Sequence, residues 1–145
     1  MLRTRVDIGK LKYKISNSTE QFFTQLSRTE QKEIGQFTTP TQVAEYMAER
    51  LLDKTDFSAN QTIKILDPGA GTGVLGLTVV ENLFMAFPHI PVKLVTYENE
   101  PIALEVLRSN LALTKDWAAE NGLLFTYEVR ERNYILEGDN LFQDS

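Results

Sequence analysis

A glycine-rich turn stands directly after an acidic residue and before a long apolar stretch. The turn runs from Asp67 to Gly73 and reads DPGAGTG, with an apolar segment over 63–66 before it and another over 74–87 after it. Glycines let the backbone turn sharply and let a ligand lie against it without a Cβ in the way. A turn that joins a strand to a helix in an open α/β sheet lies where ligands bind. We therefore interpret this turn as a ligand site.

The charge of the ligand separates two alternatives for this turn. Gly71, Gly73 and Gly76 also fit the dinucleotide pattern G-x-G-x-x-G, which is a weak signal by itself. A dinucleotide places a negatively charged pyrophosphate at the loop and helix N-terminus, where an acidic side chain has no particular advantage. S-adenosylmethionine brings a cationic ammonium and sulfonium, which the carboxylate of Asp67 could hold. A Walker A loop is excluded, because no Gly-Lys-Ser/Thr follows.

Two further acidic residues follow later predicted strands. Glu98 ends an apolar segment 98 − 67 = 31 residues after Asp67, and Asp139 lies in the segment GDNLF. A carboxylate at the end of a second strand can accept both hydroxyls of a ribose, in an NAD site or in an S-adenosylmethionine site. Asp139 would stand at the same sheet edge, where an adenine amino group could donate to it. The segment Gly138 to Asn140 is equally consistent with a simple turn.

The apolar pattern after residue 60 predicts an α/β fold. We expect strands over 63–66, 92–97 and 123–129, separated by a buried helix over 74–87 and a second helix that begins at Pro101. The apolar stripe of the second helix consists of Ile102, Val106, Leu107 and Leu111. Strands that alternate with helices predict a parallel βαβαβ arrangement, the first half of a doubly wound sheet.

The first 60 residues predict an arm and two helices. Residues 1–16 are basic and irregular, and we interpret them as an arm. A surface helix is expected over 18–33, followed by the interruption GQFTTP at 35–40 and a second helix over 41–54. The apolar stripe of this second helix consists of Val43, Met47, Ala48 and Leu51.

Composition excludes several classes of protein. The 145 residues carry 15 Lys and Arg against 20 Asp and Glu, a net charge of −5, and the length fits one domain, with a helical part over 1–60 and an α/β part over 61–145. With no Cys and one His, we expect no disulfide framework, zinc cluster or other metal site. The acidic balance argues against an independent nucleic-acid clamp. The sequence has no signal peptide and no membrane-spanning run, so we expect a cytoplasmic protein with no membrane partner.

Four motifs occur in an order that resembles gamma-class N6-adenine DNA methyltransferases of restriction–modification systems. GQFTTP is similar to motif X of that family, DPGAGTG to motif I, YENE to motif II and GDNLF to motif III. The first two together are specific, and the resemblance spans about 34–142. It implies a Rossmann-like, S-adenosylmethionine-dependent methyltransferase sheet preceded by N-terminal helices. It also implies DNA as the partner of the intact protein.

The resemblance assigns cofactor-binding roles to residues from all four motifs. These residues are Thr39, Pro40, Asp67, Gly69, Ala70, Gly71, Gly73, Glu98, Asn99, Asp139 and Phe142. Thr39, beside Pro40, would help to hold the methionine carboxylate of S-adenosyl-L-methionine. Asp67 and the backbone of the glycine-rich turn would hold the amino-acid end.

The nucleoside end of the cofactor would meet the later motifs. The resemblance implies that Glu98 takes the ribose, that Asn99 lies beside the adenine, and that Asp139 binds the adenine amino group with Phe142 as an apolar wall. Methyl transfer in this family uses an Asn/Asp-Pro-Pro-Tyr/Phe motif that stacks on the flipped base. No such tetrapeptide occurs in the sequence, so we assign no catalytic residue.

We therefore expect the S-adenosylmethionine-binding portion of a DNA adenine-N6 methyltransferase, without its catalytic half and target-recognition domain and inactive alone. A missing second half would leave residues 63–66 as an exposed edge strand beside uncovered apolar helix faces, so we expect self-association or a partner subunit. The alternatives are a related enzyme that methylates another amide, such as a protein glutamine, an NAD-binding oxidoreductase fragment, and a non-catalytic cofactor-binding module.

Overall fold

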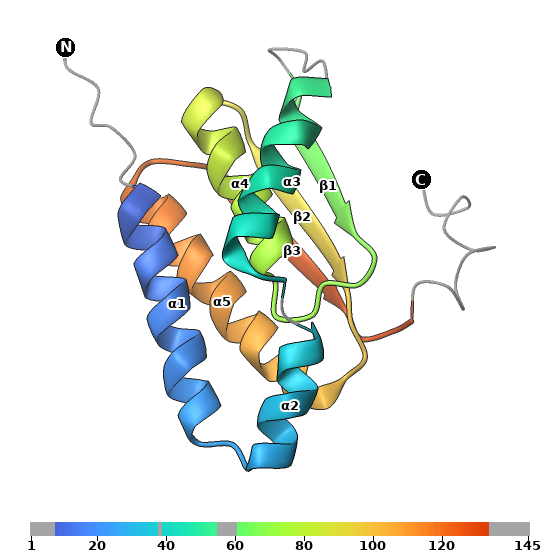
Figure 1. Ribbon diagram of the computed structural model, residues 1–145. Coiled ribbons are helices and arrows are strands. Elements are labelled where there is room, and N and C mark those ends of the chain that lie inside the picture. Colours follow the sequence, from blue (N-terminus) through green and yellow to red (C-terminus); the bar gives the residue numbers. More distant parts are fainter. Residues whose placement is uncertain (1–7, 38, 55–60, 134–145) are drawn as a thin grey trace.

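A computed structural model describes residues 8–37, 39–54 and 61–133 of the chain. The elements are α1 (Ile8–Thr24), α2 (Arg28–Phe37), α3 (Thr41–Lys54), β1 (Ile63–Asp67), α4 (Val74–Ala86), β2 (Val92–Tyr97), α5 (Pro101–Glu120) and β3 (Phe125–Arg130). The described strands form one sheet in the order β1-β2-β3 (Figure 1). The chain therefore has the α/β fold that the sequence predicts, with a partial Rossmann-like sheet.

All neighbouring strands in the sheet are parallel. Asp67 at the end of β1 lies opposite Thr96 of β2, and Thr96 lies opposite Val129 of β3. Because parallel strands end at the same edge, the residues that follow β1 and β2 meet at one edge of the sheet. β2 has the bounds predicted from the sequence, and β3 begins two residues later than predicted.

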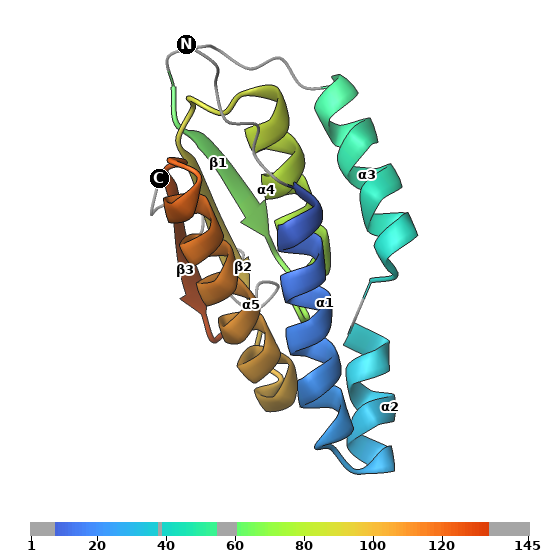
Figure 2. The same ribbon diagram turned by 90° about the vertical axis from the view of Figure 1, so that its left-hand side faces the viewer.

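Helices α4 and α5 pack against one face of the sheet. Figure 2 shows α1 and α3 farther from the strands, with α1 beside α5 and α3 beside α4. Phe84 of α4 lies at the centre of the core, with its ring centroid 6.3 Å from that of Trp117 and 6.4 Å from that of Phe125. All three side chains are buried. Burial of each such side chain contributes about 1.5–3 kcal/mol, so this contact fixes α4 and α5 on the sheet.

The expectation of an irregular arm over residues 1–16 is wrong from Ile8 onward. Helix α1 begins there, with Leu11 fully buried and Ile15 packed against the core. The side chain of Lys14 instead pairs with Glu120 of α5, at 3.5 Å between Nζ and Oε2. Lys14, one of the basic residues that suggested an arm, therefore lies on the partly exposed face of a docked amphipathic helix.

The single helix expected over 18–33 is also wrong, because a helix boundary lies within it. Helix α1 ends at Thr24, and α2 begins at Arg28. The Ser27 amide donates to Glu30 Oε1 at 3.0 Å, and the Glu30 amide donates to Ser27 Oγ at 3.2 Å. This is a capping box, and its signature S-x-x-E is present in the sequence.

Helix α3 presents a different face to the core from the one expected. Ala44 and Ala48 are buried, whereas Val43, Met47 and Leu51 are each about half exposed. Small residues let α3 approach α4 closely, which turns the larger apolar side chains outward. The predicted stripe is therefore wrong in orientation, and only Ala48 of its members is buried.

A groove of about 520 Å³ lies between α3, α4 and the outer edge of β1. We call it the β1-edge groove. Its lining residues are Tyr46, Met47, Arg50, Leu51, Lys54, Ile65, Leu66, Asp67, Pro68, Leu75, Gly76 and Val79. Among the described strands, β1 is paired on one side only. The groove therefore combines an apolar wall with a free strand edge.

Candidate functional site

The glycine-rich loop after β1 is attached to the end of β2. The Ala70 amide donates to the carbonyl of Tyr97 at 2.9 Å, and the Gly71 amide donates to Glu98 Oε1 at 2.8 Å. Gly71 and Gly73 have φ angles of 56° and 91°, in the left-handed region that favours glycine. These glycines let the loop reverse towards β2 before α4 begins.

Glu98 is buried and its carboxylate is almost fully bonded. Oε1 accepts from the Gly71 amide, and Oε2 accepts from the amides of Asn99 and Glu100 at 3.0 Å each. A carboxylate offers about four lone-pair positions, so one position on Oε1 is left for a ligand hydroxyl. A second hydroxyl would have to displace one of the backbone amides from Oε2. Glu98 thus holds the loop and can accept one further donor in this arrangement.

Asp67 places a second carboxylate at the same edge of the sheet. It is 9% exposed and accepts from the Gly69 amide at 3.4 Å. Burial raises the pKa of Asp67, the Gly69 amide opposes that rise, and the negative charge of Glu98 adds to it. Two carboxylates close to each other, one of which has a raised pKa, favour the binding of a cationic group between or beside them.

Gly76 has a structural role that needs no ligand. A Cβ at this position would lie 3.1 Å from Asp67 Oδ2 and 3.4 Å from the methyl groups of Leu94. The third glycine of the G-x-G-x-x-G pattern therefore lets α4 approach β1 and β2 closely. This contact explains the dinucleotide-like spacing without a dinucleotide.

The structure brings Thr39 and Pro40 to the first turns of α4. Both residues line a cavity of about 530 Å³, together with Val74 and Leu77 of α4 and other residues of α1 and α2. The carbonyl of Pro40 accepts from the Ala44 amide at 2.9 Å, so Pro40 stands at the start of α3. Thr39 and Pro40 thus share a cavity with the first turn of α4, the helix that follows the glycine-rich loop.

The remaining predicted site residues differ in what the structure describes. Asn99 is exposed and follows Glu98 at the edge of the sheet. Asp139 and Phe142 lie outside the described residues. Glu100, which is not among the predicted site residues, caps α5 by accepting from the Ala103 amide at 2.7 Å.

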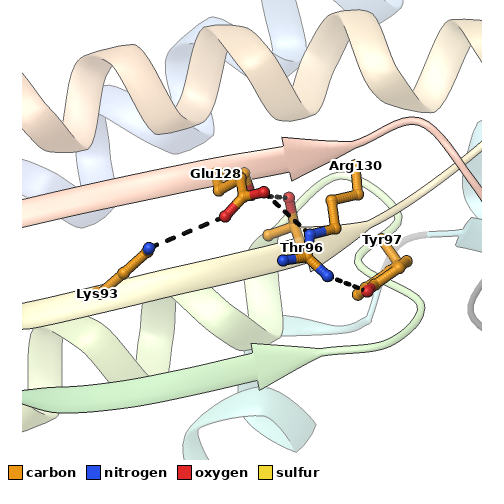
Figure 3. A network of polar contacts seen from close by, with 5 residues as sticks. All are labelled: Lys93, Thr96, Tyr97, Glu128 and Arg130. Carbon is orange, nitrogen blue, oxygen red and sulfur yellow. Dashed lines mark hydrogen bonds and ion pairs between the residues drawn. The ribbon is translucent and has the colours of Figure 1, made fainter. Parts of the chain in front are cut away.

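A polar network beside the site joins the ends of β2 and β3. Figure 3 shows Arg130 reaching from β3 to Tyr97, with its guanidinium 5.3 Å from the ring centroid and donating to the phenol oxygen. Arg130 Nε also donates to Glu128 Oε1 at 3.0 Å, and this bond lowers the pKa of Glu128. The network positions Tyr97, whose carbonyl accepts from the loop.

Sequence reasoning missed one residue that contacts the loop, Asn110 of α5. It is 0% exposed, and its side-chain amide donates to the carbonyl of Thr72 at 2.9 Å. The signal was present in the sequence, because Asn110 follows Val106 by four residues and so lies on the apolar stripe of α5. A polar residue on a buried stripe indicates a specific hydrogen-bond partner.

Within residues 8–37, 39–54 and 61–133, no helix has the length and apolar character needed to cross a membrane. The same residues contain no group of three or more His, Cys, Asp or Glu side chains that could hold a metal ion.

A family model described as N-6 DNA Methylase matches residues 12–120, from within α1 to the end of α5. The matched range contains the GQFTTP segment, the glycine-rich loop and the end of β2. No curated protein matches the chain.

Proposed function

Because the chain belongs to the N-6 DNA methylase family, we propose that the loop at residues 67–73 binds S-adenosyl-L-methionine. The chain would be the cofactor-binding portion of a site-specific DNA adenine-N6 methyltransferase of a restriction–modification system. Its helical part over 1–60 would supply Thr39 and Pro40, and its α/β part over 61–145 the remaining contacts. We place this protein in the cytoplasm, with DNA as its partner.

The observation that carries this proposal is the pair of carboxylates around the loop. Asp67 and Glu98 are both buried; burial raises the pKa of Asp67, and the negative charge of Glu98 adds a smaller rise. A ligand with a cationic ammonium group would relieve that repulsion at Asp67, whereas a pyrophosphate would add to it. The open lone-pair position of Glu98 Oε1 suits a ribose hydroxyl.

The other proposed residues contact different parts of S-adenosylmethionine. Thr39 and Pro40 would meet the methionine carboxylate near the first turn of α4, and the loop backbone from Gly69 to Gly73 would surround the amino-acid end. Asn99 would lie beside the adenine, where Asp139 and Phe142 would also contribute. When bound, S-adenosylmethionine supplies the methyl group for the amino nitrogen of adenine. We assign no catalytic group to residues 1–145, and we expect this segment to be inactive alone.

Calorimetric titration tests the cofactor. We expect saturable binding of S-adenosylmethionine and S-adenosylhomocysteine, since both carry the ammonium group that Asp67 would hold. 5′-Methylthioadenosine has the nucleoside but lacks that ammonium group, and we expect it to bind at least tenfold more weakly. NADH should give no saturable heat. Tight binding of NADH, with none of S-adenosylmethionine, would establish the oxidoreductase alternative instead.

Self-association through the β1-edge groove is a second expected result. We propose that a second copy covers the groove when this chain is alone in solution. Its lining exposes 63% of Tyr46 and 46% of Leu66 beside the free edge of β1. Unpaired edges with apolar surroundings favour strand addition. Light scattering across micromolar concentrations should show a mass that rises with concentration.

A matched pair of variants locates the contact. Leu66→Lys places a charge in the groove and should reduce association. Leu124→Lys changes a residue that is 66% exposed beside the opposite edge strand and should leave it unchanged. A strictly monomeric wild-type chain, or equal effects of both variants, would contradict this proposal.

A further inference from the structure

We propose that Asn110 is a positioning residue that holds the glycine-rich loop in its cofactor-binding conformation. This inference deepens the proposed function and rests on the assignment of that loop to S-adenosylmethionine. Asn110 does not lie in any of the four motifs that the sequence analysis identified. It acts on the cofactor through the loop backbone.

The two amide hydrogens of Asn110 connect three parts of the chain. Nδ2 donates to the carbonyl of Thr72 in the loop at 2.9 Å and to Thr19 Oγ1 of α1 at 3.2 Å. A backbone carbonyl can only accept, so the nitrogen of the side chain must face Thr72. Asn110 and Thr72 are both 0% exposed, which keeps water from replacing this bond.

The hydrogen bond from Asn110 reaches the loop at the residue between its two left-handed glycines. Thr72 lies between Gly71 and Gly73, the two loop residues with left-handed φ angles. Glycine has more conformational freedom than any other residue, so a loop that contains both needs fixed points on either side. On one side the Gly71 amide is held by Glu98, and on the other the Thr72 carbonyl is held by Asn110. Together these bonds fix the backbone conformation of the loop around Thr72.

The chemistry of the α5 stripe supports a specific role for this amide. Its neighbours Val106, Leu107 and Leu111 are apolar and buried. An amide placed among them costs free energy unless its donors are bonded, and asparagine is a poor residue for a helix interior. The Thr72 carbonyl accounts for a polar residue at this position. A purely architectural role, in which Asn110 only joins α5 to α1 through Thr19, is the competing explanation.

Three variants of the full chain separate these explanations. Asn110→Ala removes the bond to Thr72 and the bonds to Thr19, Thr19→Val removes only the link to α1, and Thr114→Val is the control. Thr114 is equally buried on α5, and its hydroxyl donates at 2.8 Å to the Asn110 carbonyl within the same helix. Amide hydrogen exchange of Gly71 and Gly73 is measured without ligand, at a temperature where each variant is folded. Affinity for S-adenosylmethionine is then measured under the same conditions.

We expect Asn110→Ala to accelerate exchange of both glycine amides by about tenfold or more, since the buried Thr72 carbonyl loses the hydrogen bond that Asn110 donates. Affinity for S-adenosylmethionine should fall by a similar factor. Thr19→Val and Thr114→Val should change both quantities by less than about threefold. Equal effects of Thr19→Val and Asn110→Ala would overturn the positioning role in favour of the architectural one.

The unliganded measurement keeps this inference separate from the proposed function. If the wild-type chain fails to bind S-adenosylmethionine while Asn110→Ala still accelerates loop exchange, the cofactor assignment is wrong and the positioning of the loop stands. If Asn110→Ala does not fold, wild-type NMR decides the question. A scalar coupling across the bond from Asn110 Nδ2 to the Thr72 carbonyl would support the proposal, and rapid solvent exchange of that side-chain amide would overturn it.

Discussion

Gly73→Ala is expected to lower the free energy of unfolding by about 2–5 kcal/mol and to abolish measurable cofactor binding. Gly73 has φ 91°, where an L-residue costs about 1–2 kcal/mol. A Cβ there would also lie 2.8 Å from Leu107 Cδ1, and Leu107 is 0% exposed in the core. Forcing a buried side chain aside adds about 1–3 kcal/mol. Urea unfolding measures the stability, and titration measures the binding.

Gly69→Ala provides the matched control within the same loop. No atom lies within 4 Å of a Cβ built at Gly69, and its backbone is outside the left-handed region. We therefore expect its stability to stay within about 0.5 kcal/mol of wild type. If Gly69→Ala and Gly73→Ala were equally stable, the backbone strain at Gly73 and its contact with Leu107 would not explain the loss of stability expected for Gly73→Ala.

Asp67→Asn is expected to weaken S-adenosylmethionine binding by about 30-fold or more. The amide keeps an oxygen for the Gly69 amide but loses the charge that would hold the ammonium group. Removing one partner of a buried charge pair costs about 2–5 kcal/mol, or more than a factor of ten in affinity. Asp116→Asn makes the same charge change at an exposed position of α5 and should bind like wild type. Equal binding by the two variants would exclude Asp67 from the site.

The effect of Asp67→Asn on the free energy of unfolding should differ from its effect on binding. The reason is that burial raises the pKa of Asp67 in the folded chain. The folded chain holds this proton more tightly than the unfolded chain. The contribution of Asp67 to stability therefore falls as pH rises from its ordinary pKa of 3.8 to the raised value, and stays low above it.

Unfolding across this pH range measures the effect, with the difference between wild type and Asp67→Asn isolating one group. At neutral pH, Asp67→Asn should be at least as stable as wild type while binding poorly. A variant that lost stability at neutral pH in proportion to its binding would show that the carboxylate supports the fold rather than the ligand.

The sequence predicted the βαβαβ part well because its signals are local. The β-branched and aromatic run 92–97 predicts a strand with the observed bounds, and Pro101 stands at the first turn of α5 as expected. The turn chemistry of the loop was also visible, since an acid and three glycines follow a short apolar strand. The hydrogen bond from the Gly71 amide to Glu98 was not predictable, because it joins residues 27 positions apart.

The bounds of α3 were predicted as observed, but the division into α1 and α2 and the buried face of α3 were predicted poorly because tertiary packing decides them. Leu11 is buried only because α1 docks on the rest of the fold, and its basic neighbours hide that pattern. In α3 the choice between Ala44 and Val43 as the buried position depends on how closely α4 approaches. By contrast, the capping box of Ser27 and Glu30 was a local signal that could have been found.

The pairing of α1 with α5 has a consequence for the order in which the chain folds. Ser18 and Thr19 bond to Ser109 and Asn110, each pair separated by 91 positions. Such a contact closes a long loop and forms slowly compared with the successive βαβ units. During synthesis α1 emerges well before α5, so it must wait for its docking surface. Helix α1 is therefore expected to be among the last elements to reach its native position. The hydrogen bond from Asn110 to Thr19 should form at the same late stage.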